Sequence, residues 1–291
     1  MKGISNNPDM HGQVCMVTGA TSGIGRATAT ALARQGARLV ITGRNEAKTQ
    51  RIVDEIQDET SSKTIDYLLA DYCDLRQVRS LAEAFQDRYT RLDVLVNNAG
   101  VFLNTRRETP YGVEQTFLVN HLAPFVLTNL LLDRLLTSAP ARIVNVSSDA
   151  HRQGTMDLSD LNYQHGFAGI KAYARSKLAT VLFTYELSRR LDSSGVTVNA
   201  LHPGHVATGM WRTGFPILGP LIGWLMARMA MTPEQGADNS VYLASSPEVA
   251  GVTGKYFVKR EAVPSAPLSY DVDLARELWQ ASTRLTGDPG S

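Results

Sequence analysis

The sequence has little of what marks a secreted or disulfide-bonded protein. Among its 291 residues are only two cysteines, Cys15 and Cys73, which lie beside apolar stretches and form no Cys-x-x-Cys pattern. They suit buried thiols of a reducing compartment better than disulfides or metal ligands. The N-terminal stretch MKGISNNPDMHGQ is polar and lacks the apolar core of a secretory signal. We therefore expect a cytoplasmic protein.

Long hydrophobic runs are also missing. The one strongly apolar stretch, FPILGPLIGWLMARMAM at residues 215–231, is shorter than the ~20 residues of a spanning helix and is interrupted by Gly, Pro and Arg228. A membrane-spanning role is excluded for it. Three interpretations stay open: a substrate lid, a subunit interface, or contact with a membrane surface.

Runs of one charge and metal-ligand motifs are absent as well. Twenty-nine Lys and Arg residues balance 28 Asp and Glu residues without a basic run, so nucleic acid is not expected as a partner. The six histidines form no His-Glu-x-x-His motif or His/Cys cluster, and we expect no metal site. No Gly-x-Ser-x-Gly motif supports a serine hydrolase.

What the sequence does contain is an alternation of apolar runs and amphipathic stretches. With 43% hydrophobic residues and no Gly-, Pro- or Ser-rich linker, it predicts a single domain over 12–285, with flexible termini at 1–11 and 286–291. The pattern predicts an α/β fold: a Rossmann-type doubly wound, mostly parallel seven-stranded sheet with helices on both faces. The expected strands are 14–20, 37–43, 64–71, 92–100, 141–148, 196–204 and 254–258, and the clearest helices are 24–35, 45–59, 75–89 and 171–192.

The first expected strand leads into TGATSGIG, residues 18–25. Glycines at 19, 23 and 25 allow a tight turn, close approach to a pyrophosphate, and tight packing of the next helix, whose N-terminus points free N–H groups at the phosphates. This context predicts a dinucleotide site. The residues that we expect to line it are Gly19, Thr21, Ser22, Gly23, Ile24 and Gly25.

A second motif, AYARSKLA at residues 172–179, places Tyr173 and Lys177 four residues apart on one helical face. Such a pair is common on helix surfaces. However, one positive charge ~4 Å from a phenol contributes about 4 kcal/mol at an effective dielectric of 20. That energy corresponds to about three pKa units, which would bring a phenol near neutrality.

Together these motifs resemble the short-chain dehydrogenase/reductase family. The resemblance rests on the wide Gly-x-x-x-Gly-x-Gly spacing, NNAG at 97–100 and YARSK at 173–177, in that order. VNHLAPFVLT, RIVNVSSDAH, AYARSKLA and SPEVAGVTGKYFV resemble the retinol-dehydrogenase-like branch. The resemblance implies an oxidoreductase that moves a hydride between a nicotinamide cofactor and a carbonyl or alcohol.

The resemblance also implies a role for each catalytic position. Tyr173 would exchange the proton with the substrate oxygen, and Lys177 would contact the nicotinamide ribose and keep the phenol acidic. Ser148, the second serine of its pair, is preferred over Ser147 as the group that bonds the substrate oxygen. Asn120 would support a water-linked proton path. Tyr163 is set aside because no lysine follows it at four residues.

The choice of cofactor depends on the end of the second expected strand. Enzymes that prefer NAD usually carry an Asp there, whereas this sequence has Gly43 followed by Arg44, which suits a 2′-phosphate. We therefore expect NADP(H). The alternative is that Arg44 merely caps a loop in solvent. The resemblance implies further cofactor contacts at Asn45, Asp71, Tyr72, Asn98, Ala99, Gly100, Tyr173, Lys177, Pro203, Gly204, Val206 and Thr208, with Asn97 as a structural brace.

The substrate side is expected in residues 209–235, where the family carries a lid. Because this segment is rich in Trp, Phe, Ile, Leu and Met, it predicts an apolar aldehyde, ketone or alcohol as substrate. Family members often pair through the segments 102–137 and 171–192, so a homodimer or tetramer is expected.

Two other functions stay open. One is an NADP(H)-binding regulatory or scaffold protein with little turnover. The other is a carbon–carbon double-bond reductase similar to protochlorophyllide reductase. That group carries a cysteine soon after the catalytic lysine, where this sequence has Leu178, Ala179 and Thr180.

Overall fold

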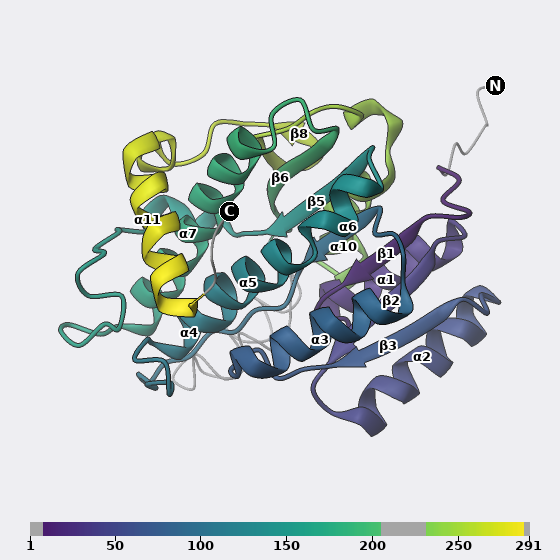
Figure 1. Ribbon diagram of the computed structural model, residues 1–291, viewed down its shortest axis with the longest axis horizontal. Helices are drawn as coiled ribbons and strands as arrows, with labels where there is room; N and C mark the ends of the chain where they lie inside the picture. The colour runs from purple at the N-terminus through teal and green to yellow at the C-terminus, as the bar shows by residue number, and fades with distance from the viewer. Residues whose placement is uncertain (1–7, 205–230, 288–291) are drawn as a thin grey trace.

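The computed structural model describes residues 8–204 and 231–287, and strands and helices alternate along them (Figure 1). The strands are β1 (Val14–Val17), β2 (Arg38–Gly43), β3 (Ile65–Leu69), β4 (Val94–Asn97), β5 (Ala141–Val146), β6 (Val196–His202), β7 (Tyr256–Val258) and β8 (Glu261–Ala262). The helices are α1 (Gly23–Arg34), α2 (Glu46–Thr60), α3 (Leu75–Arg88), α4 (Gln115–Phe117), α5 (Ala123–Leu130), α6 (Leu132–Thr137), α7 (Gly169–Arg190), α10 (Pro233–Ser245) and α11 (Val272–Thr286). Four short helical turns are η1 (Leu118–Leu122), η2 (Asp149–Gln153), η3 (Pro247–Val249) and η4 (Pro267–Tyr270).

All the strands form one sheet in the order β3-β2-β1-β4-β5-β6-β7-β8, in which β1 to β7 are parallel. The predicted Rossmann-type fold is thus confirmed, with an eighth strand added to the expected seven. The extra strand β8 folds back antiparallel on β7 through Lys259 and Arg260, which have φ of 50° and 66°. The sequence did not reveal this hairpin, because its turn has no Gly or Asn and β8 is only two residues long.

Two helical layers cover the sheet, as alternate residues of β1 illustrate. Val14 and Met16 join the core with α3, α5, α7 and α11, whereas Cys15 and Val17 face α1, α2 and α10. In Figure 1, α3, α5 and α7 cross in front of the strands, and α1 and α10 lie behind them. Because both faces are buried, the strands read as continuous apolar runs in the sequence.

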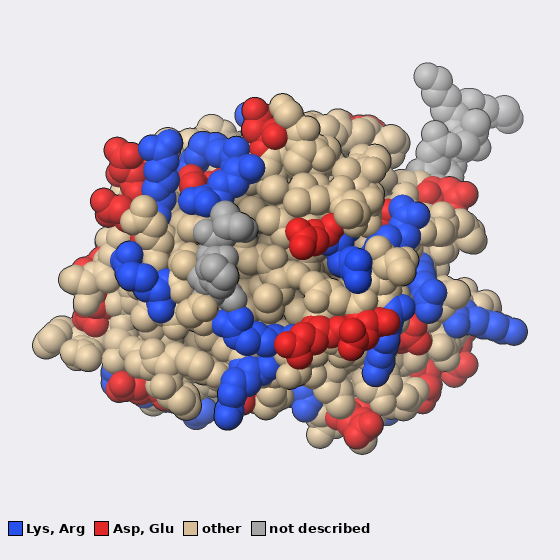
Figure 2. Space-filling model, in the orientation of Figure 1, with Lys and Arg blue, Asp and Glu red and all other residues tan. Residues whose placement is uncertain are grey.

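Helix α11 adds a further layer beside α7 (Figure 1). The Trp279 ring centroid lies 4.9 Å from that of Phe125 in α5 and 5.8 Å from that of Phe183 in α7. On the face shown in Figure 2, Lys and Arg side chains are interspersed with Asp and Glu side chains.

The carboxyl ends of the adjacent strands β1, β4, β5 and β6 meet at one edge of the sheet. The strand order reverses between β1 and β4, and ligands of open α/β sheets bind in the crevice outside such a reversal. The motifs found in the sequence follow these strands directly. The fold therefore gathers them at one place.

Several expectations fall on residues outside the described ranges. Val206 and Thr208 belong there, as do most of the lid expected at 209–235 and of the apolar stretch 215–231. The described parts of the chain contain no helix that is both long enough and apolar enough to cross a bilayer.

Candidate active site

The glycine turn after β1 packs directly against the NNAG turn after β4. The Thr18 hydroxyl accepts hydrogen bonds from the backbone N–H groups of Asn98 and Ala99, at 2.9 and 3.0 Å. Gly19 has φ of +64°, and a Cβ there would lie 2.8 Å from the Ala99 Cα. Only glycine fits this approach, which brings two of the predicted cofactor segments into contact.

Helix α1 begins inside this turn, at Gly23. Its N-cap, Ser22, has an extended backbone, and its side chain does not cap the helix. The start of the helix lies beside the NNAG turn, because a Cβ placed on Gly25 would meet Asn98 Nδ2. Thr21, just before it, borders Gly43 at the end of β2. A helix N-terminus in this position suits a phosphate group.

The predicted brace, Asn97, is buried at the end of β4. Its Nδ2 donates to Asn145 Oδ1 at 2.8 Å and to Thr128 Oγ1 at 3.0 Å. These bonds tie β4 to β5 and α5 just behind the predicted cofactor turn.

The two serines after β5 have different partners. The Ser147 hydroxyl donates to the backbone carbonyl of Lys177 at 2.9 Å, so it serves the packing of α7. Ser148 instead forms a side-chain hydrogen bond with Tyr173. The geometry therefore agrees with the choice of Ser148 as the serine that faces the predicted phenol.

Lys177 and Tyr173 lie on the same side of α7, as expected from their spacing. Lys177 Nζ is 5.6 Å from the centre of the Tyr173 ring and donates to the Val146 carbonyl at 2.9 Å. The edge of Phe102 packs against the Tyr173 ring, with centroids 5.6 Å apart. The site is thus enclosed on one side by an aromatic ring.

Asn120 sits in η1, a π-helical turn that interrupts the run from α4 to α5. Its Oδ1 accepts from the Val101 N–H at 2.7 Å, and its Nδ2 donates to the Val101 carbonyl and to Ser176 Oγ at 3.0 and 2.9 Å. A Cβ placed on Gly100 would lie 3.3 Å from Asn120 Oδ1 and 3.6 Å from Lys177 Nζ. Asn120 and Lys177 therefore meet beside the NNAG turn.

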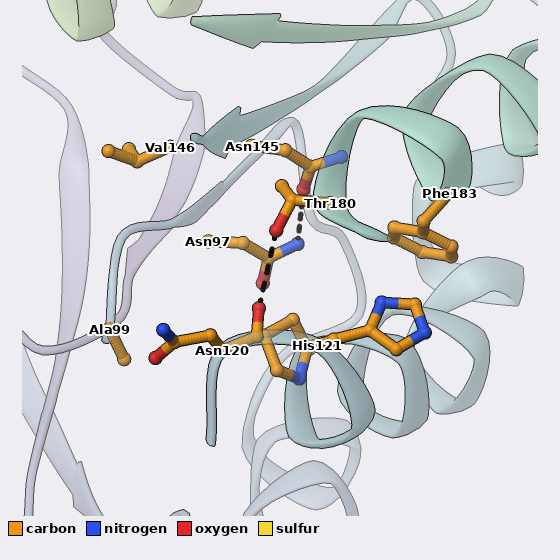
Figure 3. A pocket seen from close by; sticks show the side chains of 9 residues that line it. Asn97, Ala99, Asn120, His121, Asn145, Val146, Thr180 and Phe183 are labelled. Atoms are coloured by element: carbon orange, nitrogen blue, oxygen red, sulfur yellow. Dashed lines mark hydrogen bonds between the residues drawn. The ribbon is translucent and has the colours of Figure 1, made fainter. Parts of the chain in front are cut away.

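Behind Asn120 is a buried cavity of about 10 Å³ (Figure 3). The Asn120 backbone carbonyl accepts a hydrogen bond from Thr180 Oγ1 at 3.4 Å across it. Asn97 Oδ1 and His121 Nδ1 have no hydrogen-bond partner among the described residues. A space of this size with several polar atoms suits a single water molecule. It is lined by Asn97, Ala99, Asn120, His121, Pro124, Asn145, Val146, Thr180 and Phe183.

Burial dominates the acid–base properties of the pair on α7. Desolvation raises the pKa of Tyr173 to about 12, although the hydrogen bond to Ser148 partly opposes it. Desolvation also lowers the pKa of Lys177 to about 8. Burial is thus the main influence on the pKa of Tyr173, and acidification of the phenol by the Lys177 ammonium stays a prediction.

At the start of α2, an open pocket of about 730 Å³ carries three positively charged side chains. Arg44 was predicted at this place from the sequence, but Lys48 and Arg51 were not. The sequence feature that indicates these two residues is their i, i+3 spacing in the first two turns of the helix after Arg44. The pocket is lined by Thr21, Arg44, Asn45, Ala47, Lys48 and Arg51.

Other predicted cofactor residues take mainly structural contacts. Asn45 caps α2, with Oδ1 accepting from the Lys48 N–H at 2.8 Å, and Asp71 Oδ1 accepts from the Cys73 N–H at 2.9 Å. Tyr72 is buried, with its hydroxyl 3.4 Å from Thr42 Oγ1. Contact of the Asp71 carboxylate and the Tyr72 backbone N–H with an adenine stays a prediction.

The turn after β6 brings Pro203 and Gly204 to the same edge of the sheet. Gly204 has φ of +87°, a left-handed conformation that favours glycine. His202, the last residue of β6, accepts a hydrogen bond at Nδ1 from the Asp149 N–H at 3.2 Å. The turns after β5 and β6 are thus joined directly.

Known proteins match the part of the chain that carries the motifs described above. Residues 13–216 match the short chain dehydrogenase family model. Retinol dehydrogenase 13 of Homo sapiens is 44% identical over 285 residues, covering 95% of this chain and 85% of that protein. Polyprenol dehydrogenase of Homo sapiens is 38% identical, covering 96% of this chain and 87% of that protein.

A solved structure with a similar fold supports the same family. The crystal structure of a short chain dehydrogenase from Escherichia coli CFT073 complexed with NADPH matches with a TM-score of 0.71 and 29% identity. The match covers 86% of this chain and 98% of the other.

These relatives contradict the expected cytoplasmic location. Retinol and polyprenol, which appear in their names, are apolar alcohols that partition into membranes. The similarity sets this chain beside membrane-associated relatives, so the cytoplasmic prediction was wrong. It rested only on absent sequence features, which do not report contact with a membrane surface.

The matched segment contains the glycine turn, the NNAG turn and the Tyr173–Lys177 pair, and the similarity to the retinol and polyprenol dehydrogenases extends over nearly the whole described fold. The chain belongs to the short-chain dehydrogenase/reductase family, in its retinol-dehydrogenase-like branch, and is an oxidoreductase that binds a nicotinamide dinucleotide.

Proposed function

We propose that this protein interconverts an apolar aldehyde or ketone and its alcohol, using NADP(H), with Tyr173 as the proton donor and acceptor. The observation that carries the proposal is the hydrogen bond between Ser148 and Tyr173, beside Lys177 and next to the glycine turn. When bound, the reduced nicotinamide supplies the hydride for the carbonyl carbon.

The chain's own residues handle the oxygen and the proton. Ser148 donates a hydrogen bond to the substrate oxygen and holds it beside the phenol. As negative charge develops on that oxygen, Tyr173 transfers its proton to it, and the alcohol forms. Lys177 and Asn120, whose backbone carbonyl faces the small polar cavity, would relay a proton from bulk solvent to the phenolate.

The protonation state of Tyr173 determines how each direction of the reaction would begin. A phenol with a pKa of about 12 is protonated at neutral pH, which is the form that donates a proton. Oxidation requires the phenolate, so the bound oxidised nicotinamide, which is positively charged, must add to the lysine charge in that direction.

The basic pocket supports NADP(H). Arg44, Lys48 and Arg51 surround an open space at the N-terminus of α2, and a 2′-phosphate there would receive charge-assisted hydrogen bonds. Each such bond contributes about 1.5–3 kcal/mol. None of the described residues that line this pocket is a carboxylate that would instead bind the free ribose hydroxyls of NAD.

Two separate observations support an apolar substrate. Phe102 packs in a T-shaped contact against the Tyr173 ring, and the related proteins are named for retinol and polyprenol. Both are alcohols whose bulk is hydrocarbon, so an apolar binding surface would stabilise them by burying that hydrocarbon.

A panel of carbonyl substrates tests the proposal. NADPH and NADH oxidation would be followed with retinal, long-chain aliphatic aldehydes, aromatic ketones and small polar carbonyls, in detergent micelles. We expect turnover with the apolar members and NADPH. Turnover confined to small polar carbonyls would refute the apolar substrate, and no turnover with any member would refute the proposed reaction.

A further inference from the structure

One peptide group beside the proposed catalytic serine is held at both ends by imidazole rings. The carbonyl oxygen of Ser148 lies 2.7 Å from His151 Nδ1, and the N–H of Asp149 donates to His202 Nδ1 at 3.2 Å. These two backbone groups belong to the same peptide bond. Because a peptide unit is planar, the two contacts fix its orientation directly after Ser148.

His151 is held in one tautomer by its surroundings. It is fully buried in η2, and its Nε2 accepts a hydrogen bond from the Ala266 N–H at 3.0 Å. Since Nε2 is an acceptor, the ring hydrogen of the neutral form lies on Nδ1 and is donated to the Ser148 carbonyl. The ring also packs on Tyr256, with centroids 4.6 Å apart. Burial lowers the pKa of His151, which agrees with a neutral ring.

His202 makes the complementary contact from another strand. Its Nδ1 accepts, so this nitrogen carries no proton, and its own backbone carbonyl accepts from Asn239 Nδ2 in α10 at 3.4 Å. The next two residues are Pro203 and Gly204, which we expect to line the nicotinamide. The contact therefore links the position of the serine to that of the cofactor turn.

Apart from its hydrogen bond with Tyr173, the side chain of Ser148 has one further contact that orients it. Its Oγ accepts from the Ala150 N–H at 3.2 Å, and its backbone is extended, with φ of −160° and ψ of 156°. A rotation about ψ would swing the following peptide and the turn η2 relative to the Oγ. Displacements of ~1 Å in such groups reduce rates by about 10²-fold.

We propose that His151 and His202 are positioning residues that clamp the Ser148–Asp149 peptide and thereby aim the Ser148 hydroxyl at the substrate oxygen. The proposal rests on the proposed reductase function for its kinetic consequence. Its geometric content, two neutral rings of opposite tautomer on one peptide, stands apart from turnover.

His202 offers the cleaner substitution because it lies at a strand end and is not fully buried. His202→Leu removes the acceptor at similar volume, whereas His202→Asn keeps an oxygen near the place of Nδ1. We expect kcat to fall about 10–100-fold in His202→Leu, with the Kd for NADPH changed less than about 3-fold, and most of the loss to be recovered in His202→Asn. The matched control is His11→Leu, whose side chain is 81% exposed near the opposite edge of the sheet, and it should leave kcat unchanged.

His151 is tested without substitution, because removing a buried ring endangers folding. Imidazole nitrogen chemical shifts of the full chain with NADPH, measured by NMR at pH 7.5, should show His151 neutral with hydrogen on Nδ1 and His202 neutral with hydrogen on Nε2. The His202 variants assign the His202 signals, and nuclear Overhauser contacts with the Tyr256 ring, 4.6 Å away, assign those of His151.

Three results would overturn the clamp: an unchanged kcat in His202→Leu, a loss that His202→Asn does not recover, or a protonated or opposite tautomer at either ring. If the wild-type chain turns over no carbonyl at all, the proposed function fails. The NMR tautomers then still decide the clamp by itself.

Discussion

At the scale of the residue, one proposed catalytic group lies in surroundings that destabilise its charged form. Lys177 is buried, and desolvation lowers its pKa to about 8 from an ordinary value of 10.5. This difference corresponds to roughly 3 kcal/mol of stability lost while the buried amine is charged. The chain thus places its one buried ammonium of α7 where the nicotinamide ribose is expected.

The first prediction concerns the stability lost by burying the charged Lys177 side chain. Below pH 8 the lysine is charged in the folded and the unfolded chain, so the full penalty applies at pH 7, and it declines as the pH rises from 8 to about 10.4. Lys177→Met should therefore raise the free energy of unfolding at pH 7 by about 1–3 kcal/mol, measured by urea denaturation, while turnover is lost. The gain stays below the full penalty because the Val146 carbonyl loses its donor. A less stable variant would show that the lysine is not strained in the folded state.

The second prediction concerns the basic pocket. Arg44→Asp should weaken NADPH binding about 10–100-fold relative to NADH, since one charge-assisted bond is lost and a repulsive charge is added. Isothermal titration with both nucleotides measures the ratio. Lys63→Asp makes the same change of charge on an exposed residue beyond the C-terminal end of α2 and should leave the ratio unchanged. Equal shifts in both variants would mean that only net charge matters.

Single residues also show what a sequence can reveal. The proximity of Tyr173, Lys177 and Ser148 could be predicted because short motifs specify them, and their catalytic roles stay a prediction. The pKa of Tyr173 could not be predicted, since it depends on burial by segments far apart in the chain. Lys48 and Arg51 have the spacing of any solvated helix face, and only the structure shows that they border a pocket.

At the scale of the element, α11 is the helix whose importance the sequence did not indicate. Trp279 packs between Phe125 and Phe183, and the guanidinium of Arg190 lies 4.1 Å from the centre of its indole ring. α11 therefore completes the core on the side of α5 and α7. A hydrogen bond also links α11 to the candidate site: Ser282 Oγ lies 2.9 Å from Nε2 of His121, the neighbour of Asn120.

The third prediction follows from this packing. Trp279→Ala should lower the free energy of unfolding by about 3–5 kcal/mol, because it removes a large buried side chain and leaves a cavity. Denaturant unfolding followed by far-UV circular dichroism measures it. Arg276→Ala, on the exposed side of the same helix, should change stability by less than about 0.5 kcal/mol. Similar losses in both would mean that α11 contributes through helix propensity rather than packing.

The fourth prediction concerns His121, whose pKa burial lowers to about 3. The unfolded chain takes up a proton near pH 6.5 that the folded chain refuses, so stability is complete above that pH and declines below it. Between pH 6 and 4 the loss approaches about 1.4 kcal/mol for each pH unit. His121→Phe, which fits among Phe117, Phe125 and Phe183, should reduce this slope in urea unfolding. An unchanged slope would place the titration elsewhere.

Most elements could be predicted from periodicity, with boundaries displaced by a few residues. The long helices α1, α2, α3 and α7 lie almost where their patterns placed them. The π turn η1 and the turn η2 could not be predicted, because each depends on tertiary contacts: Asn120 bonds Val101, and His151 bonds Ala266. These two turns carry or adjoin the proposed catalytic groups.

At the scale of the whole molecule, the strand order explains why distant motifs meet. The reversal between β1 and β4 brings the turns after β1, β4, β5 and β6 to one edge, and this arrangement was readable from the alternation of strands and helices. The site of action in the cell was not readable, because an absent signal says nothing about contact with a membrane surface.

The assembly of the chain stays a prediction. We propose a homo-oligomer, and α11 limits how it could form, because it already covers part of α5 and α7. A dimer through these helices would have to use the remaining surface.

The central claim is that Tyr173 delivers the proton that accompanies hydride transfer from NADPH to an apolar carbonyl. The most direct measurement is a single turnover with NADPH carrying deuterium at the transferable position and an apolar aldehyde, followed by mass spectrometry of the alcohol. We expect deuterium on the former carbonyl carbon with the wild-type chain. With Tyr173→Phe, we expect a rate lower by about 10²–10⁴-fold and an NADPH affinity close to that of the wild type. An unlabelled alcohol, or a Tyr173→Phe variant that transfers the label at the wild-type rate, would contradict this claim.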